Sequence, residues 1–302
     1  MLYDIIIVGA GPSGLTAALY ALRDDRKVLI LEREGIGGNI ALSPRIENYP
    51  GIKVTSGPNF VSELYEQVVS FGGDVEIEEV EKIVPGNPIK VITSDATYTT
   101  KTVIIATGTR FKHLGVKGED EYFGNGISIC AICDGAFNKN KTVAVIGGGN
   151  SALINALELA PICKKVYLFA DGPRLYGEDE RIHAVMNHSH IEIHYSSEVQ
   201  SFNGTDEDLT SVSVKEKGQV KDYEISGAFL AVGQIPNSEI VKDMIKTNKN
   251  GGLISNEQLE TTIPGVFVAG DCRAKEVRQL TTAVGDGTIA YRSALAYLNK
   301  MK

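Results

Sequence analysis

The feature that most constrains this chain is a strand, glycine turn and helix pattern that occurs twice. The first copy runs from residues 4–8 (DIIIV) through residues 9–14 (GAGPSG) into an Ala- and Leu-rich stretch. The second runs from residues 142–146 (TVAVI) through residues 147–152 (GGGNSA) into a similar stretch. Each pattern is typical of a βαβ unit. The repeat therefore predicts an α/β chain with two Rossmann-like, three-layer dinucleotide-binding domains.

Further strands complete these units and set the predicted boundaries. A second apolar run follows each helix, at residues 27–31 (KVLIL) and 165–169 (KVYLF). Three more apolar runs lead into glycine, at residues 103–106, 228–232 and 266–269, and a helical pattern over residues 282–298 follows the last of them. If Gly270-Asp271 belongs with the first βαβ unit, the second domain is inserted into the first. The predicted domains are residues 1–113 with 242–302, and residues 114–241.

Composition excludes several classes of function. A net charge of −8 repels phosphate backbones, so nucleic acid is not an expected partner. No apolar run approaches the roughly 20 residues of a membrane helix, and the first residues lack a basic region typical of a signal peptide. Four cysteines are too few for a secreted disulfide scaffold. We therefore expect a cytoplasmic protein without a membrane anchor.

The first glycine turn has the complete context of a dinucleotide site. Gly9 permits a tight turn, Gly11 lets the backbone approach a pyrophosphate, and Gly14 lets helix and strand pack closely. The helix N-terminus favours an anion, and Glu32 after the next strand can accept a hydrogen bond from a ribose hydroxyl. This context predicts a bound dinucleotide rather than a chance glycine turn.

Two other segments favour FAD as that dinucleotide. Asp271, after a strand near the C-terminus, suits a carboxylate that reaches the ribityl chain of a flavin. Residues 37–39 (GGN), after the second strand, can present backbone groups to the isoalloxazine ring.

Cys130 and Cys133 form a C-x-x-C motif, which in a cytosolic α/β protein indicates a redox pair. A zinc site would need two more ligands, but Cys163 and Cys272 are isolated, which is typical of small buried residues. The spacing of the histidines fits no metal motif either; these are His183, His188, His190 and His194. No metal site is expected.

Asp134, directly after the pair, is a candidate proton donor or acceptor for a departing thiol. It is equally compatible with a helix N-cap or a turn, since Asp134-Gly135 is a turn signal. The residues alone also leave open which cysteine attacks a substrate. Farther along the chain, residues 203–221 contain Val212 and Val214 between polar neighbours, and predict an exposed strand or hairpin.

From residue 4 to residue 300, the chain resembles the low-molecular-weight thioredoxin reductases. The resemblance is carried in order by GAGPSG, GGN, IENYPG, ATG, CAICD, GGGNSA, VGQIPN, AGD and RQLTTAVGDG. It implies about one FAD per chain, a homodimer and thioredoxin as substrate. The implied FAD-binding residues are Gly9, Gly11, Pro12, Ser13, Gly14, Glu32, Gly38, Asn39, Asn48, Ala106, Thr107, Gly108, Asp271, Arg278, Gln279 and Leu280. Each of Asn48 and Thr107, taken alone, is also compatible with an ordinary turn residue.

The resemblance also implies roles for the redox motif. Cys133 would face the flavin and take electrons from it, Cys130 would attack the substrate disulfide, and Asp134 would act as the acid–base group.

The second glycine turn departs from the family. Relatives carry a His-Arg-Arg run and a further Arg after the second strand, because a ribose phosphate calls for guanidinium groups. Here residues 170–173 read ADGP, and Tyr176 stands near the later Arg position. Asp171 would repel a phosphate, and the direction of Arg174 after Gly-Pro is not fixed by the sequence. NADPH is therefore doubtful as the electron donor.

Three donors stay open. The pattern resembles the ferredoxin-dependent flavin thioredoxin reductases, so reduced ferredoxin is the favoured donor. Asp171 could instead accept a hydrogen bond from the ribose of NADH, or NADPH could bind through a displaced Arg. Candidate basic residues for an acidic partner are Arg23, Arg26, Lys27 and Arg45. A flavin-binding redox sensor without turnover is the alternative outside enzymes, and the C-x-x-C argues against a ferredoxin–NADP reductase.

Overall fold

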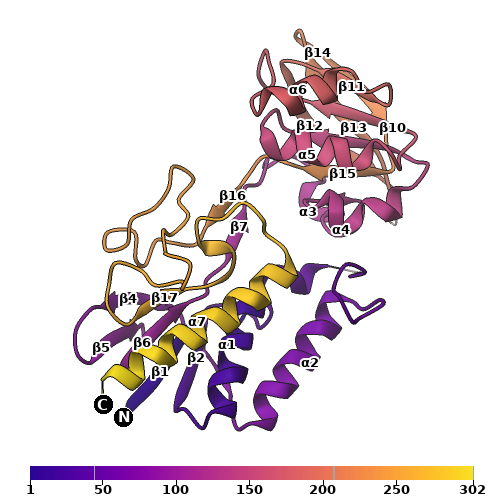
Figure 1. Ribbon diagram of the computed structural model, residues 1–302. Coiled ribbons are helices and arrows are strands. Elements are labelled where there is room, and N and C mark those ends of the chain that lie inside the picture. The colour runs from indigo at the N-terminus through magenta and orange to yellow at the C-terminus, as the bar shows by residue number, and fades with distance from the viewer. Residues whose placement is uncertain (44, 207, 302) are drawn as a thin grey trace. The chain divides into compact units, whose positions relative to one another are not determined.

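The computed structural model describes residues 1–43, 45–206 and 208–301. The chain divides into a first unit, Met1–Arg110 with Ile235–Lys302, and a second unit, Phe111–Gln234 (Figure 1). The two crossings lie in β7 (Thr109–Phe111) and β16 (Gln234–Pro236), which pair with each other. The second unit is thus inserted into the first, as the position of Gly270-Asp271 predicts.

The first unit is built on a mixed sheet in the order β3-β2-β1-β6-β5-β4, with β17 on β6. The strands are β1 (Leu2–Val8), β2 (Val28–Glu32), β3 (Val75–Ile77), β4 (Val80–Val84), β5 (Ile89–Thr93), β6 (Thr97–Ile105) and β17 (Val266–Val268). Strand β6 pairs with β1 along one edge. Its other edge is shared: β5 pairs antiparallel with its beginning, and β17 pairs parallel with its end. A C-terminal strand therefore completes a sheet that the N-terminus begins.

Alternation along β1 gives this sheet two buried faces, since successive strand residues point to opposite sides. Ile5 and Ile7 belong to the core beneath the helices α1 (Pro12–Arg23), α2 (Gly57–Ser70) and α7 (Leu280–Lys300). Ile6 and Val8 belong to the core on the other face.

Helix α7 runs along α1, as Figure 1 shows. The two helices approach closely at Gly287, where an added Cβ would lie 2.3 Å from the carbonyl oxygen of Ser13. An added Cβ at Gly270 would likewise lie 2.5 Å from Ser13 Oγ. The C-terminal Gly-Asp element therefore lies beside the first glycine turn.

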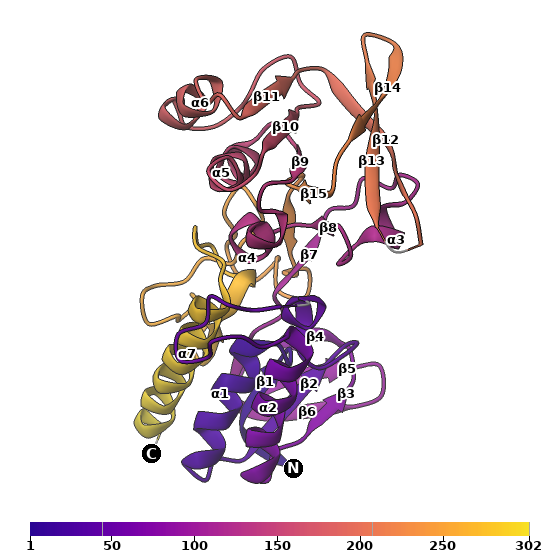
Figure 2. The ribbon, with the colours of Figure 1, turned by 90° about the vertical axis from the view of Figure 1, so that its right-hand side faces the viewer.

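The second unit contains a parallel sheet in the order β11-β10-β9-β15-β8 and an antiparallel sheet β12-β13-β14. Figure 2 shows α5 and α6 on one side of the parallel sheet, and the antiparallel sheet with α3 on the other. The parallel strands are β8 (Ile127–Ser128), β9 (Thr142–Ile146), β10 (Lys165–Phe169), β11 (Ile191–His194) and β15 (Gly227–Leu230). The helices are α3 (Glu119–Tyr122), α4 (Ala131–Asp134), α5 (Asn150–Leu159) and α6 (Asp179–Met186).

The antiparallel sheet consists of β12 (Ser197–Gly204), β13 (Leu209–Glu216) and β14 (Gln219–Glu224). The predicted hairpin is confirmed, but its predicted exposure is wrong for one face. Val212 and Val214 are fully buried, because that face of β13 packs with Ile146 and Phe169 of the parallel sheet.

His194, at the end of β11, joins the two sheets. Its Nδ1 lies 2.7 Å from Glu216 Oε1 on β13, and Nε2 lies 2.9 Å from Glu192 Oε1. Tyr223 on β14 donates a hydrogen bond of 2.7 Å to the other oxygen of Glu216. These contacts, together with the rings of Tyr167 and Phe169 around them, form what we call the His194 clamp.

Among the described residues, no helix combines the length and the apolar character that crossing a membrane would require.

Candidate active site

The first glycine turn connects β1 to α1 and leaves backbone amides at the start of α1 without a side-chain cap. Gly11 is the N-cap of α1 and no side chain caps this end, so the amides of the first turn can bind a ligand. An added Cβ at Gly11 would meet only the carbonyl oxygen of Gly37, at 3.9 Å, whereas one at Gly14 would lie 1.9 Å from that of Gly9. Gly14 thus serves packing, while Gly11 lines open space.

Glu32, at the end of β2, is fixed against this turn. Its Oε2 accepts a hydrogen bond of 2.8 Å from the amide of Ala10, and its Oε1 accepts one of 3.1 Å from the amide of Glu34. Each carboxylate oxygen has a second lone pair. Glu32 can therefore still accept from the ribose hydroxyls of a dinucleotide.

The segment after β2 folds over the turn. Gly37 donates a backbone hydrogen bond of 2.9 Å to Ala10, and an added Cβ at Gly38 would lie 3.7 Å from Gly11 Cα. The Asn39 amide donates to the carbonyl oxygen of Thr109 at 2.7 Å. Gly38 and Asn39, both predicted cofactor residues, thus lie at the open side of the turn.

The residues that follow β6 form the opposite wall. The carbonyl oxygen of Ala106 would be 2.4 Å from a Cβ on Gly9. The Thr107 hydroxyl donates to the carbonyl oxygen of Asn237 at 2.5 Å, and the Asn237 amide donates back to Thr107 at 2.9 Å. The Thr107 hydroxyl is therefore engaged by the protein, and its neighbour Gly108 follows with a positive φ of 62°.

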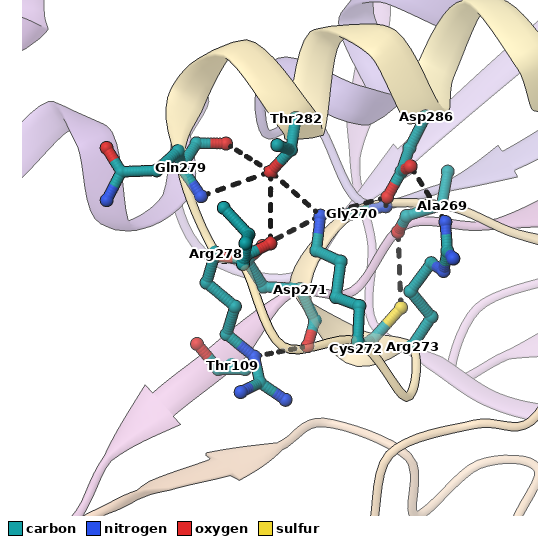
Figure 3. Close-up of polar contacts among 12 residues, drawn as sticks. Thr109, Ala269, Gly270, Asp271, Cys272, Arg273, Arg278, Gln279, Thr282 and Asp286 are labelled. Atoms are coloured by element: carbon teal, nitrogen blue, oxygen red, sulfur yellow. Dashed lines mark hydrogen bonds and ion pairs between the residues drawn. The ribbon is translucent and has the colours of Figure 1, made fainter. Parts of the chain in front are cut away.

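The C-terminal elements close the site (Figure 3). Asp271 lies in a short helical turn after β17, and its backbone carbonyl accepts from Arg278 Nε at 3.4 Å. Gln279 is the N-cap of α7, Leu280 is the first helical residue, and the Gln279 side chain accepts from the Asn48 amide at 3.3 Å. Asn48 and Gln279 are thereby brought together from distant parts of the sequence.

Asp271 is the most informative group for a ligand. Burial raises the pKa of its carboxyl group, while Lys275 and Arg278 oppose that rise. Its buried Oδ1 lies 3.3 Å from Lys275 Nζ but accepts no hydrogen bond from the described residues. A hydroxyl of a ribityl chain would satisfy this oxygen. FAD fits these residues, because Glu32 suits the ribose and the open N-terminus of α1 suits the pyrophosphate.

Every cofactor residue predicted from the sequence lies in the first unit. The predicted catalytic residues all lie in the second unit.

Cys130 and Cys133 form a disulfide with a Cα–Cα distance of 5.3 Å. Cys130 is the N-cap of α4, and its sulfur accepts from the amide of Cys133 at 3.3 Å. Both cysteines are half-buried, whereas Ile132 between them is 51 % exposed. The disulfide is therefore fixed at the N-terminus of a short helix, next to an exposed apolar side chain.

Asp134 is held by Ser128 and not by a capping interaction. Ser128 Oγ donates to Asp134 Oδ2 at 2.5 Å and accepts from the amide of Cys130 at 3.1 Å. The other oxygen of Asp134, Oδ1, is buried without a hydrogen-bond partner among the described residues. Burial raises the pKa of this carboxyl group, although the bond from Ser128 lowers it. Asp134 therefore keeps its proton to a higher pH than an ordinary aspartic acid does, as a general acid requires.

Ser128 is a candidate functional residue that the sequence analysis does not predict. The only signal is a hydroxyl residue two positions before the first cysteine of the motif.

Cys163 and Cys272 are buried free thiols, as predicted. Burial raises the pKa of Cys163 to about 11, which disfavours the reactive thiolate.

The second glycine turn retains the geometry of an anion site. Gly149 is the N-cap of α5 without a side-chain cap, and an added Cβ there would meet nothing within 4 Å. Tyr176 donates a backbone hydrogen bond of 2.7 Å to Gly148, and the guanidinium of Arg174 lies 5.0 Å from the centre of the Tyr176 ring. Arg174 therefore lies on a segment tied to this turn, while Asp171 is exposed.

Three of the basic residues predicted for an acidic partner lie far from the first glycine turn. Arg23 is the last residue of α1, and Arg26 and Lys27 follow it. A helix of 12 residues is about 18 Å long, so these charges stand at the opposite end of α1 from the turn.

Comparison with known proteins places this geometry in context. The family described as "Pyridine nucleotide-disulphide oxidoreductase" matches residues 3–287. The chain is 38 % identical over 302 residues to a thioredoxin reductase of Ureaplasma parvum, covering 99 % of this chain and 97 % of that protein. It is 37 % identical over 301 residues to a "34.2 kDa protein in rubredoxin operon" of Clostridium pasteurianum, covering 98 % and 97 %. The crystal structure of thioredoxin reductase from Streptococcus pyogenes superposes with a TM-score of 0.94 at 39 % identity, covering 99 % of both chains.

Proposed function

Because this chain belongs to the pyridine nucleotide-disulphide oxidoreductase family, we propose that it is an FAD-dependent thioredoxin reductase. The observation that carries the proposal is the half-buried Cys130–Cys133 disulfide next to Asp134, whose buried Oδ1 accepts no hydrogen bond from the described residues. A redox sensor without turnover would not need a proton held next to its thiols.

FAD, when bound, would supply the two electrons that reduce the disulfide. Reduction yields two thiols, so protons must be delivered as the S–S bond breaks. Asp134 holds one of them at Oδ1, because Ser128 occupies Oδ2. By family resemblance, the Cys130 thiolate then attacks the thioredoxin disulfide and Cys133 resolves the mixed disulfide, which leaves reduced thioredoxin and the Cys130–Cys133 disulfide.

We propose reduced ferredoxin, a one-electron iron–sulfur protein, as the donor. The carboxylate of exposed Asp171, at the end of β10, would repel a ribose phosphate. The name of the Clostridium pasteurianum relative links that protein to an operon for another small iron protein, which supports a donor of this class.

A pyridine nucleotide donor is the second candidate, and one observation favours it. The uncapped N-terminus of α5 and the neighbouring Arg174 segment together offer an anion site. NADPH would use Arg174 for its phosphate, whereas NADH would use Asp171 for its ribose.

The test is anaerobic spectroscopy of the flavin band with reduced ferredoxin, NADH and NADPH offered separately. Oxidised thioredoxin is then added and its thiols are counted over many cycles. Rapid bleaching by ferredoxin and many thiols per chain support the proposal. Rapid bleaching by NADPH overturns the ferredoxin donor but not the reductase. Bleaching by NADH that is lost in Asp171→Ala supports the ribose-binding alternative.

The matched control for the thiol chemistry is Cys163→Ala, which removes a buried cysteine of the same unit outside the motif. It should reduce thioredoxin at the wild-type rate. Protein that takes up no FAD, or thiols that stop at one equivalent, would overturn the reductase itself.

We also propose a cytoplasmic homodimer, on family resemblance. Light scattering of the purified protein should give the mass of two chains.

A further inference from the structure

A buried ammonium group lies directly behind the Asp271 carboxylate. Lys275 follows the Gly270–Cys272 turn, and its side chain is only 9 % exposed. Its Nζ lies 2.9 Å from Asp286 Oδ2, 3.2 Å from Thr282 Oγ1 and 3.3 Å from Asp271 Oδ1. Three oxygens, two from α7 and one from the Gly270–Cys272 turn, thus surround one cation.

Asp286, on α7, connects this cation to the Gly-Asp turn. Its carboxylate is buried and also accepts from the backbone amide of Gly270 at 3.0 Å and from Arg273 Nη1 at 2.8 Å (Figure 3). Lys275 and Arg273 therefore neutralise Asp286 while the carboxylate holds the turn against α7.

Thr282 connects the same cation to the N-terminus of α7. Its hydroxyl oxygen accepts from the backbone amide of Gln279 at 3.1 Å, closing a capping box at the first turn of the helix. Lys275 thus contacts both elements that flank the proposed flavin site, the Asp271 turn and the beginning of α7.

The groups around Asp271 indicate that Lys275 compensates the charge of its carboxylate. A buried carboxylate is costly unless a partner compensates it. The charged groups that act on Asp271 are Lys275, Arg278 and the like-charged Asp286, which Arg273 also contacts, and Cys272 is its neighbour in the chain. Arg278 reaches the Asp271 backbone oxygen with its Nε. Among the described residues, the Asp271 carboxylate forms its ion pair with Lys275.

We propose that Lys275 is a positioning residue for the flavin: anchored by Asp286 and Thr282, its ammonium keeps Asp271 an ionised acceptor for a ribityl hydroxyl. The inference rests on the proposed function, since it requires that FAD binds in the first unit. Lys275 touches no reacting atom in this role and acts through Asp271.

The test measures FAD affinity of the apoprotein by titration, followed through flavin fluorescence. Losing one hydrogen bond to a charged group should weaken FAD binding about tenfold or more in Lys275→Met and in Lys275→Gln. Lys275→Arg keeps the positive charge and should recover most of the affinity. The matched control is Lys249→Met, an exposed lysine of the same unit, which should bind FAD like the wild type. Urea unfolding of each apoprotein establishes that it is folded.

Two readouts separate this role from a merely structural one. In a double-mutant cycle, adding Asp271→Asn to Lys275→Met should weaken FAD binding little further, because both changes remove the same ionised acceptor. The loss of FAD affinity on acidification should also begin at a higher pH in Lys275→Gln than in the wild type. Without the ammonium, burial and Asp286 raise the pKa of Asp271 further.

Equal FAD affinity in wild type, Lys275→Met and Lys275→Gln would overturn the inference while leaving the proposed function intact. Additive effects in the cycle, with an unshifted pH profile, would overturn it as well. A folded wild-type apoprotein that takes up no FAD would overturn the proposed function and this inference together.

Discussion

At the scale of single residues, the proposed chemistry depends on which oxygen of Asp134 is free. Ser128 fills one oxygen with its own hydrogen bond, so the proton of the carboxyl group resides on Oδ1. The same hydroxyl accepts from the amide of Cys130, which ties the acid to the redox motif. Ser128 therefore determines which oxygen of Asp134 carries the proton. Its hydrogen bond also lowers the pKa at which that proton leaves.

Replacing Asp134 by Asn should slow dithiol formation about 10²- to 10⁴-fold without loss of FAD, because the general acid is gone. In the wild type, the rate should fall as pH rises through the raised pKa of Asp134, where the carboxyl group loses its proton. Ser128→Ala removes the bond that lowers this pKa, so the alkaline limb should move to higher pH. Stopped-flow rates across pH measure both effects; a wild-type rate in Asp134→Asn would exclude the acid role.

At the residue scale, the sequence predicts candidate residues where local motifs indicate the chemistry. The redox cysteines, Asp134 and the glycine turn each sit in a short pattern with a physical reason. Ser128, Asn237 and Lys275 escape prediction because their partners are set by the fold: Asn237 reaches Thr107 across 130 positions of the sequence. A lone Ser, Asn or Lys carries no pattern that marks such contacts.

At the scale of elements, the packing of α7 on α1 brings the C-terminal segment to the glycine turn. Gly287 permits a close approach of the two helices, whereas an added Cβ at Gly285 on the same helix would meet nothing within 4 Å. An alanine substitution at each of these glycines therefore compares a crowded position with an open one on the same helix.

Gly287→Ala should lower the free energy of unfolding by about 1–3 kcal/mol and weaken FAD binding, since its Cβ would overlap the backbone of α1. Gly285→Ala should instead be neutral or stabilise by up to about 1 kcal/mol, because alanine is the better helix former. Urea unfolding and FAD titration of both variants provide the check. A stable Gly287→Ala variant with normal FAD affinity would show that α7 can shift without consequence.

The His194 clamp makes the second unit sensitive to acid. Burial opposes the shift, but hydrogen bonds from Tyr223, Ser197 and His194 hold the pKa of Glu216 below its ordinary value of 4.5. Its contribution to stability is therefore present above that value and is lost as pH falls through the lower native pKa.

Glu216→Gln should remove this contribution, on the order of 1 kcal/mol, and flatten the pH dependence of unfolding below about pH 5. Urea midpoints of wild type and variant should converge as the pH falls. An equal gap at all pH values would mean that the Glu216 charge contributes nothing.

Elements marked by glycine were the most predictable. Residues 142–146, an apolar run that ends in a glycine turn, coincide with β9, and residues 165–169, the apolar run after the next helix, coincide with β10. The face of β13 was less predictable. Its alternation predicts one apolar side, but whether that side meets solvent or another sheet depends on the distant β9 and β10.

At the scale of the whole molecule, the two proposed redox groups belong to different units. The FAD residues lie in the first unit and the disulfide in the second. Flavin reduction and thiol chemistry should therefore be separable by mutation.

Cys133→Ser should abolish thioredoxin reduction while FAD stays bound and reducible by its donor, because the first unit is unchanged. The measurement is flavin bleaching together with a count of thioredoxin thiols. Continued turnover in this variant would contradict the proposed electron path.

The shared edge of β6 has a consequence for how the protein is made. Ribosomes release the chain from its N-terminus, so β6 leaves the exit tunnel long before β17, which pairs with its last residues. Domains generally fold as units during synthesis. The inserted second unit can thus fold while translation continues, whereas the N-terminal segment waits with an incomplete sheet for β17 and α7. We therefore expect the segment before the insertion to complete its sheet only after β17 and α7 have been translated.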